Sequence, residues 1–500
     1  MAHARSPGLD VAVAGATLVG SRPGSDARMI AVAAPPADVS VASPGFASGD
    51  DRSFFGHPKG LAYLAFTEAW ERFSFYGMSA LLLLYMIQRL LTPEVMGGVL
   101  GLGVFRSALE GITGPLSDRA FASQVYGLYT GLVYFTPMFG GLLADRLLGQ
   151  RRTVMLGAVL MAAGHILMAF DAGFLTALAL LILGSGCLKG NISTQVGHLY
   201  PPGEENRRTR AFAIFSAAIN VGAFAGPLIC AIVAQAWGWH AGFGLAGGFM
   251  LIALVIYAKG WPHLPPDVKR IGGGSRPPPM TSHDWQVVAV LGAISAIQIP
   301  VVIAYYQQTN MGLLFIEESV TRTLWGWTVP TPAFVALDGL FCFSLVPLLI
   351  LGWRWQERRG REPGEQGKIA IGYLLTVLAN LLMLLPAGWI DADASLKVSM
   401  IWPFLLSLLN GVGFLYYWPT LLALFSRAAP RGLNATMMGV LFFSTFVGSV
   451  LMGAVGGYWG AMSRVDFYLL HAGFAAGPLI AMLLIARPAT RLLAPRATAP

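Results

Sequence analysis

Three charged residues lie close together in the first long apolar segment of the chain. Glu68, Glu71 and Arg72 stand at positions i, i+3 and i+4, so a helix would place all three on one face. A charge inside a membrane helix costs about 2.5 to 3.5 kcal/mol on insertion scales, so this face cannot point at lipid. We expect it to face a cavity or a partner; the alternative is an internally neutralised salt bridge that only fixes packing.

Lys189 is a single cation in a second apolar segment, GCLKGNIS, where no neighbouring acid neutralises it. Its partner must come from another helix, and Glu68 or Glu71 is the simplest choice. A pair that breaks on protonation would act as a proton-driven switch. In the alternative interpretation the lysine extends its ammonium group to the membrane interface.

Asp338, in PAFVALDGLFCF, is the one acid deep in the second half of the sequence. Together with the two glutamates, the arginine and the lysine it gives three acids and two bases, a net charge of −3 + 2 = −1. One captured proton would neutralise the set. The alternative is a hydrated residue near a helix end, since Pro330 and Pro332 precede it closely.

Several amides occur together in another apolar segment, as Gln307, Gln308 and Asn310. This pattern predicts a polar stripe that faces a transport pathway. Hydrogen bonds that only join neighbouring helices are the alternative.

A basic loop, GGLLADRLLGQRR, joins two apolar segments. Asp145 can bridge to cations or cap the next helix, while Arg146, Arg151 and Arg152 keep the loop in the cytoplasm. We interpret this loop as a gating or packing element and not as a substrate site.

These residues lie in a chain whose composition is suited to lipid. Hydrophobic residues make up 55% of it and charged residues only 12%, against about 25% in soluble domains. Apolar segments of roughly 20 residues recur, each long enough to span a bilayer as a helix. We expect an all-α membrane protein with about twelve transmembrane helices, near residues 62–90, 123–147, 153–171, 173–198, 211–235, 241–260, 285–314, 333–354, 369–388, 397–425, 433–457 and 467–487.

Lys and Arg gather in alternate loops, which predicts a multi-pass protein of the bacterial inner membrane with both termini in the cytoplasm. The net charge of +8 therefore indicates topology and not nucleic-acid binding. We expect the following organisation: a disordered cytoplasmic tail (1–55), a six-helix bundle (56–260), a cytoplasmic linker rich in Pro and Gly (261–284), a second six-helix bundle (285–490) and a short tail (491–500). The long connection over 91–122 has no functional interpretation at this stage.

Enzyme and metal chemistry find no support in the sequence. Cys187, Cys230 and Cys342 lie inside apolar segments without metal-ligand spacing, and no motif such as HExxH is present. We expect neither a metal nor another cofactor.

The charged segments also resemble a known family. The stretch from Glu68 to Gly77 resembles the ExxERFxxYG signature of the proton-dependent oligopeptide transporter family, in the major facilitator superfamily. The loop described above, VYFTPMFGG, LKGNISTQVGHLY, the INVGA pattern and GWHAGFGLAG agree as well. The resemblance implies a major facilitator fold of two six-helix bundles and uptake of di- and tripeptides with protons. It assigns coupling to Glu68, Glu71, Arg72 and Lys189, and pocket positions to Tyr76, Tyr134 and Asn220.

The chain departs from the family at the positions that bind the two ends of a peptide. Ser79 stands where an arginine normally receives the carboxylate, and Phe414 stands where a glutamate normally receives the amino group. Tyr306 replaces the acid of an EQQ pattern, while Asp338 stands at a position where asparagine is usual. We therefore expect a pocket of aromatic and amide character that includes Tyr76, Tyr134, Tyr306, Gln308, Phe414 and Trp418.

Together these observations favour a proton-coupled symporter for peptides or peptide-like solutes, working as a monomer in the lipid bilayer. The alternatives are a carrier or exporter of a non-peptide metabolite, favoured by the replaced charges, and a receptor that senses without transport.

Overall fold

The computed structural model describes residues 51–201, 203–267, 280–430 and 432–493, and nearly all of them are helical. The expected terminal tails lie mostly outside the described residues, as does half of the expected linker. Inside the described ranges, every apolar segment that was predicted to span the membrane coincides with a helix or a series of joined helices.

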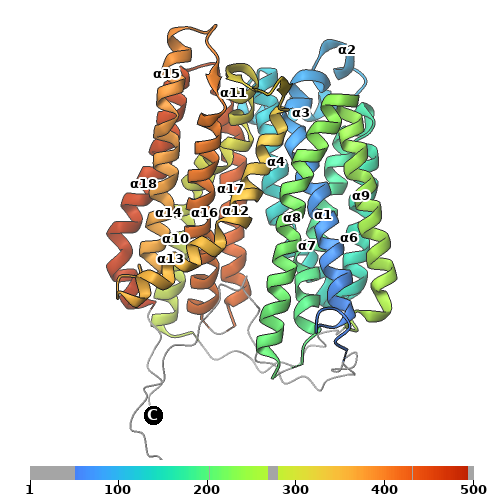
Figure 1. The fold of residues 1–500 in the computed structure, drawn as a ribbon, viewed down its shortest axis with the longest axis vertical. Coiled ribbons are helices and arrows are strands. Elements are labelled where there is room, and N and C mark those ends of the chain that lie inside the picture. Colours follow the sequence, from blue (N-terminus) through green and yellow to red (C-terminus); the bar gives the residue numbers. More distant parts are fainter. Residues whose placement is uncertain (1–50, 202, 268–279, 431, 494–500) are drawn as a thin grey trace, which may run out of the picture.

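The first half of the chain forms one group of helices (Figure 1). Its long helices are α1 (Lys59–Tyr85), α4 (Asp118–Phe135), α6 (Gln150–Leu167), α7 (Phe174–His198), α8 (Glu205–Trp237) and α9 (Trp239–Gly260). Shorter elements extend or join them: η1 (Met86–Leu90), α2 (Pro93–Met96), α3 (Leu102–Thr113), α5 (Pro137–Leu143), η2 (Ala144–Leu148), η3 (Asp171–Gly173) and η4 (Trp261–His263).

The second half forms the other group. Its helices are α10 (Ser282–Tyr306), α11 (Met311–Ser319), α12 (Ala336–Ser344), α13 (Val346–Arg358), α14 (Glu365–Leu382), α15 (Leu384–Ala392), α16 (Ile401–Ala428), α17 (Asn434–Gly456) and α18 (Arg464–Leu492). The turns η5 (Gln307–Thr309) and η6 (Thr331–Val335) interrupt or precede them. Two short strand pairs complete it: β1 (Val320–Thr321) with β4 (Val398–Ser399), and β2 (Thr323–Leu324) with β3 (Trp327–Thr328).

Within each half the helices pack mainly on one another. The helix α1 lies against α8 and α9, and α6 lies against α7; in the second half, α14 packs on α16 and α18, and α10 packs on α17 and α18. Two helix pairs join the halves, namely α4 with α17 and α8 with α12. This arrangement is an all-α membrane fold of the major facilitator type.

Among the described residues, nine helices are long and apolar enough to cross a membrane, or ten if the bent pair α12–α13 counts as one span. Two of the twelve expected spans do not meet this criterion. The first is α4 with α5, which carries Asp118 and Arg119 and is broken before Pro137; the second is α6, which begins Gln-Arg-Arg. Both pack inside the bundle, where contacts with other helices compensate for lower hydrophobicity.

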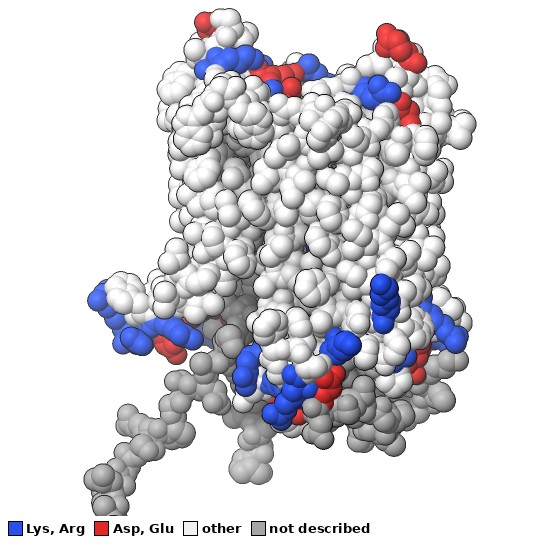
Figure 2. Space-filling view, turned by 45° about the vertical axis from the view of Figure 1, so that its right-hand side comes forward, with Lys and Arg blue, Asp and Glu red and all other residues white. Residues whose placement is uncertain are grey.

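Charged residues gather at the two ends of the molecule, and a broad apolar surface separates them (Figure 2). The loops with Arg151, Arg207, Arg358 and Arg427 lie at one end, which we call the basic end. The helix α3 and the turn before α11 lie towards the other end (Figure 1). The apolar surface has the character that a bilayer requires.

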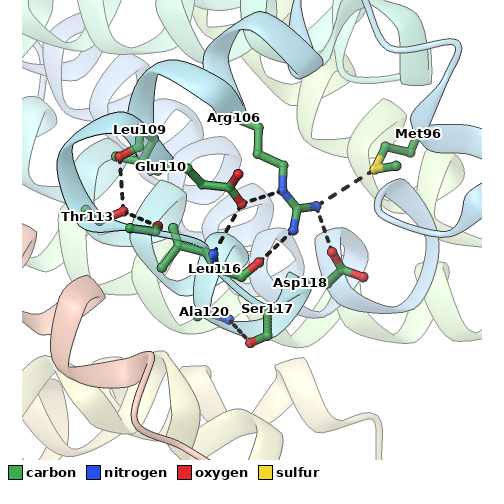
Figure 3. A network of polar contacts seen from close by, with 10 residues as sticks. Met96, Arg106, Leu109, Glu110, Thr113, Leu116, Ser117, Asp118 and Ala120 are labelled. Atoms are coloured by element: carbon green, nitrogen blue, oxygen red, sulfur yellow. Dashed lines mark hydrogen bonds and ion pairs between the residues drawn. The ribbon is translucent and has the colours of Figure 1, made fainter.

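The long connection before α4 is ordered around one arginine (Figure 3). Arg106 donates hydrogen bonds to Glu110 (2.9 Å), Asp118 (2.8 Å) and the carbonyl of Leu116 (2.7 Å). Glu110 also accepts from the backbone N–H of Leu116 (3.2 Å). These bonds hold α3 against the first turn of α4 and give the connection a defined shape. The charges of this connection are visible in the sequence, but the contact between Arg106 and Asp118 depends on how the turn between α3 and α4 folds.

We expect Arg106→Gln to speed amide hydrogen exchange several-fold over residues 106–117, because one substitution removes the donor that three acceptors share. Ser107→Ala, on the exposed side of the same helix, is the matched control and should leave exchange unchanged. Equal exchange in wild type and Arg106→Gln would show that the network does not hold the connection in place.

The network should also respond to acid. The Arg106 hydrogen bond, followed by the Leu116 N–H, holds the pKa of Glu110 below its ordinary value. Because the pKa of Glu110 is lower in the folded protein than the value of about 4.3 in the unfolded chain, the ionised carboxylate stabilises the fold at any pH above about 4.3. This contribution is lost as the pH falls through the pKa that Glu110 has in the folded protein. Protection of α3, corrected for intrinsic exchange, should therefore be constant at neutral pH and decline only below about pH 4. Glu110→Gln should lack this acid-dependent decline.

Candidate functional site

The charged residues of α1 form a compact buried cluster. The guanidinium of Arg72 lies 3.0 Å from a carboxylate oxygen of Glu68 and also forms an ion pair with Glu71. All three side chains are almost completely inaccessible to solvent. The predicted helical face therefore exists, and it points into the protein and not towards lipid.

Glycines allow a second helix to approach this cluster closely. A β-carbon at Gly222 of α8 would lie 2.4 Å from the carbonyl oxygen of Ala69, and one at Gly226 would lie 2.3 Å from that of Phe73. Only residues without a side chain fit at these points, which form a small-xxx-small pattern. The same stretch of α8 also meets the second half, since Gly339 of α12 packs on the backbone of Ala223.

The ammonium of Lys189 faces two aromatic rings. It lies 4.6 Å from the ring centre of Phe75 and 5.0 Å from that of Tyr134. The guanidinium of Arg72 lies 5.4 Å from the centre of the same Phe75 ring, so both cations contact this ring. Among the described residues no ion pair joins Lys189 to Glu68 or Glu71; the pairing expected from the sequence stays a prediction, and the structure gives cation–π contacts at this point.

Hydroxyl groups continue this arrangement into the second half. The hydroxyl of Tyr134 lies 2.8 Å from that of Tyr306, and these two residues come from α4 and α10. The neighbouring Tyr305 donates a hydrogen bond of 2.6 Å to Asp338 on α12. Residues from both halves thus form an almost continuous line from the α1 cluster, through Lys189 and three tyrosines, to Asp338.

Aromatic and amide side chains surround the second half of this line. Phe414 stacks on Tyr305 with ring centres 5.2 Å apart, and Trp418 stacks on Phe414 at 6.1 Å. Gln308 accepts a hydrogen bond of 3.2 Å from Asn410 of α16. A small cavity beside Asp338, with room for about one water molecule, is lined by Gln308, among others. The aromatic and amide character expected of this region is what the structure contains.

Other predicted pocket residues lie close by. Tyr76 and Ser79 are half-buried on α1, within two turns of Arg72, and Asn220 is half-buried on α8, one turn before the close contact with Arg72.

The basic loop lies at the basic end of the first half, away from this line of residues. Arg151 donates hydrogen bonds from its side chain to the carbonyls of Pro265 and Leu264 and from its backbone N–H to Asp267 (2.7 Å). Gly149 has a φ of +83° and lies directly against Asp267, so a side chain would be strained and would collide there. Arg146 and Arg152 are exposed, and Asp145 lies in η2. Hydrogen bonds from this loop therefore connect the start of α6 to the segment that follows α9.

Polar contacts between the halves lie towards the end opposite the basic end. Arg119 at the start of α4 pairs with Glu318 at the end of α11 at 2.9 Å. Deeper in the protein, Asn310 donates a hydrogen bond of 2.7 Å to Ser123. Gln235 of α8 donates to the carbonyl of Thr328 at 3.1 Å. These bonds hold the two halves together at that end.

Sequence reasoning missed four residues of this region. Phe75 and Tyr305 each stand next to a residue that was singled out, and Asn410 lies one turn before Phe414. An aromatic ring three residues after Arg72 was a usable signal for a cation–π contact, because i and i+3 share a helix face. Gly222 was noticed only as part of a pattern and not as the point of contact between α1 and α8.

Comparison with known proteins identifies the chain. The family model described as the POT family matches residues 151–272 and 283–462, which is more than half of the sequence. The chain belongs to the POT family. It is therefore a transporter and not an enzyme, as expected from the sequence.

Relatives in this family have been named as peptide transporters. The chain is 29% identical over 480 residues to the peptide transporter YePEPT of Yersinia enterocolitica, covering 81% of this chain and 89% of that protein. It is also 29% identical over 515 residues to a di-/tripeptide transporter of Lactococcus lactis, covering 89% and 98% of the two chains.

Solved structures agree with the fold. The crystal structure of a peptide transporter POT in complex with sulfate has a TM-score of 0.75 and 26% identity, covering 88% of this chain and 97% of that one. A POT family transporter in complex with 5-aminolevulinic acid has the same TM-score at 23% identity, covering 88% and 98%, and shows likeness of fold alone.

Gly222→Ala should destabilise the protein by about 1–3 kcal/mol, because the new methyl group would overlap the α1 backbone beside Arg72. Thermal unfolding of the purified protein would measure the loss. Gly244→Ala is the matched control: this glycine is exposed on α9, nothing lies near its β-carbon position, and alanine is the better helix former. If both variants unfold alike, the contact between α1 and α8 is not as tight as the geometry indicates.

Proposed function

We propose that this POT family transporter takes up peptides or peptide-like solutes together with protons by alternating access. The observation that carries the proposal is the line of buried and half-buried residues from the Glu68–Arg72–Glu71 cluster to Asp338. Ionisable groups buried in membrane helices are costly and usually serve proton or substrate movement. Here they stand at both ends of a line that crosses from one half of the protein to the other.

Proton coupling is proposed for five residues. With Arg72 and Lys189 charged, the acids Glu68, Glu71 and Asp338 carry one negative charge more than the bases balance. Uptake of one proton neutralises the set and lowers the cost of charge in the apolar interior. Lys189 has aromatic partners and no carboxylate within ion-pair distance among the described residues, so its position is free to change when a glutamate gains or loses a proton.

The substrate is inferred to be a peptide-like solute, with support from the names of the relatives. Ser79 and Phe414 occupy the positions at which the family resemblance expects charges for the two ends of a peptide. The stacked rings of Tyr305, Phe414 and Trp418 offer apolar contact in their place. Such a surface favours larger or terminus-blocked solutes over small free peptides.

Alternating access has support from the contacts between the halves. The bonds through Arg119, Ser123 and Gln235 close the end opposite the basic end, and these are the contacts that must break for the other state to form. We infer that the basic end faces the cytoplasm, because Lys and Arg favour that side. The proposal includes a bacterial inner-membrane location, two six-helix bundles over 56–260 and 285–490, and a monomer.

A carrier or exporter of a non-peptide metabolite is the second candidate, and the replaced charges at Ser79, Tyr306 and Phe414 are what favour it. Counterflow in proteoliposomes separates both candidates from a receptor that binds without transport.

Lys189→Ala should abolish accumulation driven by a pH gradient and leave counterflow partly intact, because the proposal gives Lys189 a role in coupling and not in binding. Uptake into proteoliposomes with and without a pH gradient measures both activities. Lys259→Ala, at an exposed position near the end of α9, is the matched control and should behave as wild type. Undiminished gradient-driven accumulation in Lys189→Ala would refute the assignment.

Dialanine should bind wild type weakly, with a Kd above about 1 mM in calorimetry, since neither terminus meets an opposite charge at Ser79 or Phe414. A terminus-blocked peptide with aromatic side chains should bind more tightly. Phe414→Glu restores an acid at the expected amino-group position and should improve dialanine binding without improving that of the blocked peptide. Tight binding of dialanine by wild type would contradict this account of the pocket.

A further inference from the structure

A second cavity lies inside the second half of the protein, separate from the contact between the halves. It is small, with room for about one water molecule, and it adjoins the cavity beside Asp338, because Gln308 and Tyr468 line both. Its polar lining comes from η5, α14, α16 and α18, and consists of Gln307, Gln308, Asn380, Asn410, Tyr468 and His471.

Four of these side chains have a buried polar atom without a hydrogen-bond partner among the described residues. The atoms are Nε2 of Gln307, Oδ1 of Asn410, the hydroxyl of Tyr468 and Nε2 of His471. All four residues are at most 5% exposed. An unsatisfied buried polar group costs about 1–3 kcal/mol, so four such groups around one cavity require a small polar occupant. A polar cavity of this kind holds water, which donates and accepts in turn.

The tautomer of His471 follows from its one hydrogen bond. Its Nδ1 lies 2.6 Å from the carbonyl oxygen of Phe467, one turn earlier on α18. A carbonyl oxygen can only accept, so in the neutral ring Nδ1 carries the hydrogen and Nε2 carries a lone pair. Nε2 is also the ring nitrogen that has no partner among the described residues. Nε2 is therefore placed to take a proton from a hydronium ion in the cavity. One O–H bond of the hydronium ion breaks and an N–H bond forms, which leaves a neutral water molecule and an imidazolium with a charge of +1.

The charged surroundings of this imidazole are sparse. The described residues of η5, α10, α11, α14 and α16 that line the cavity contribute only amide and apolar side chains or glycine, and Tyr468 is the other titratable group. Arg464, at the start of α18 and one turn before Tyr468, pairs with Asp391 of α15. The adjoining cavity is lined by Asp338, and Gln308 lines both cavities.

We propose that this cavity is a hydrated proton-binding site, in which Nε2 of His471 is the acceptor and water beside Gln308 connects it to Asp338. The role in transport rests on the proposed proton coupling, whereas hydration and protonation do not depend on any substrate. Protonated His471 would offset the charge of Asp338 within the same half of the protein. The second half would thus contain its own group that binds and releases a proton.

Hydration is tested first, on wild-type protein, by radiolytic hydroxyl-radical labelling with mass spectrometry. Radicals form from water at the site, so Tyr468 and His471 should be oxidised several-fold faster than Tyr373 and His165, which are equally buried and line neither cavity. Asn410→Leu, which replaces an amide whose oxygen has no partner among the described residues by an apolar side chain of similar size, should reduce labelling of Tyr468. Labelling of Tyr468 and His471 no faster than that of Tyr373 would overturn the proposal.

Protonation is tested by NMR of protein labelled with ¹⁵N-histidine. The resonances of His471 are those lost in His471→Asn, whose amide can still donate to the Phe467 carbonyl. Nε2 should gain a proton as the pH is lowered, and the protonated fraction at a given pH should fall in Asp338→Asn. An Nε2 that stays unprotonated throughout, or a fraction that Asp338→Asn leaves unchanged, would refute the site or its connection to Asp338.

The role in transport is tested with His471→Gln, which retains a polar group and removes the titrating one. It should flatten the dependence of gradient-driven uptake on pH and leave counterflow unchanged. If His471 titrates but the pH profile of His471→Gln matches wild type, the site does not take part in coupling. If wild type shows no gradient-driven uptake at all, the proposed function fails, while labelling and NMR still decide whether the site exists.

Discussion

The cost of keeping charge away from water governs the interior of this protein. Arg72 lies between two carboxylates in the middle of α1, and all three groups are buried. Removing one member of such a cluster costs about 3–5 kcal/mol, because the remaining charges lose their compensation. The neighbouring helices are arranged accordingly: α8 packs on one side of the cluster through glycine contacts, and α7 places Lys189 against aromatic rings and not in an ion pair with either carboxylate.

The sequence predicted the parts of this arrangement that are local. Spacing along one helix placed Glu68, Glu71 and Arg72 on a common face, and apolar periodicity located every span. Contacts between helices were not predictable in the same way. The contact between Phe75 and Lys189 depends on how α1 and α7 cross. The hydrogen bond from Tyr305 to Asp338 depends on how α10 and α12 meet. A single sequence carries no measure of these crossings.

Lys189 contacts aromatic rings where an ion pair with a carboxylate was expected, and this difference has a physical consequence. A cation over a ring gains about 0.5–2 kcal/mol, and it keeps its charge without a fixed partner. A salt bridge to a buried acid binds more tightly and must be broken before the lysine moves. The rings of Phe75 and Tyr134 contact Lys189 without a fixed ionic partner, and under the proposed coupling a change of charge at Glu68 or Glu71 would displace it. Under the proposed function, the stacked ring of Phe414 would likewise accept solutes of different shape.

The connection between the two halves runs through the backbone of α8. Within five residues, Gly222 and Gly226 contact α1 at Arg72 and Phe73, and Ala223 contacts Gly339, the residue after Asp338. No side chain lies between these backbones to absorb a displacement. Any rotation of one half against the other must therefore alter the contact between α8 and α12 directly beside Asp338, while the contact with α1 beside Arg72 lies on the same rigid turn. Close packing at glycines thus places Arg72 and Asp338, the two ionisable ends of the line, on either side of one helix segment. Under the proposed coupling, a displacement that follows a change of charge at one end would be transmitted through this segment to the other end.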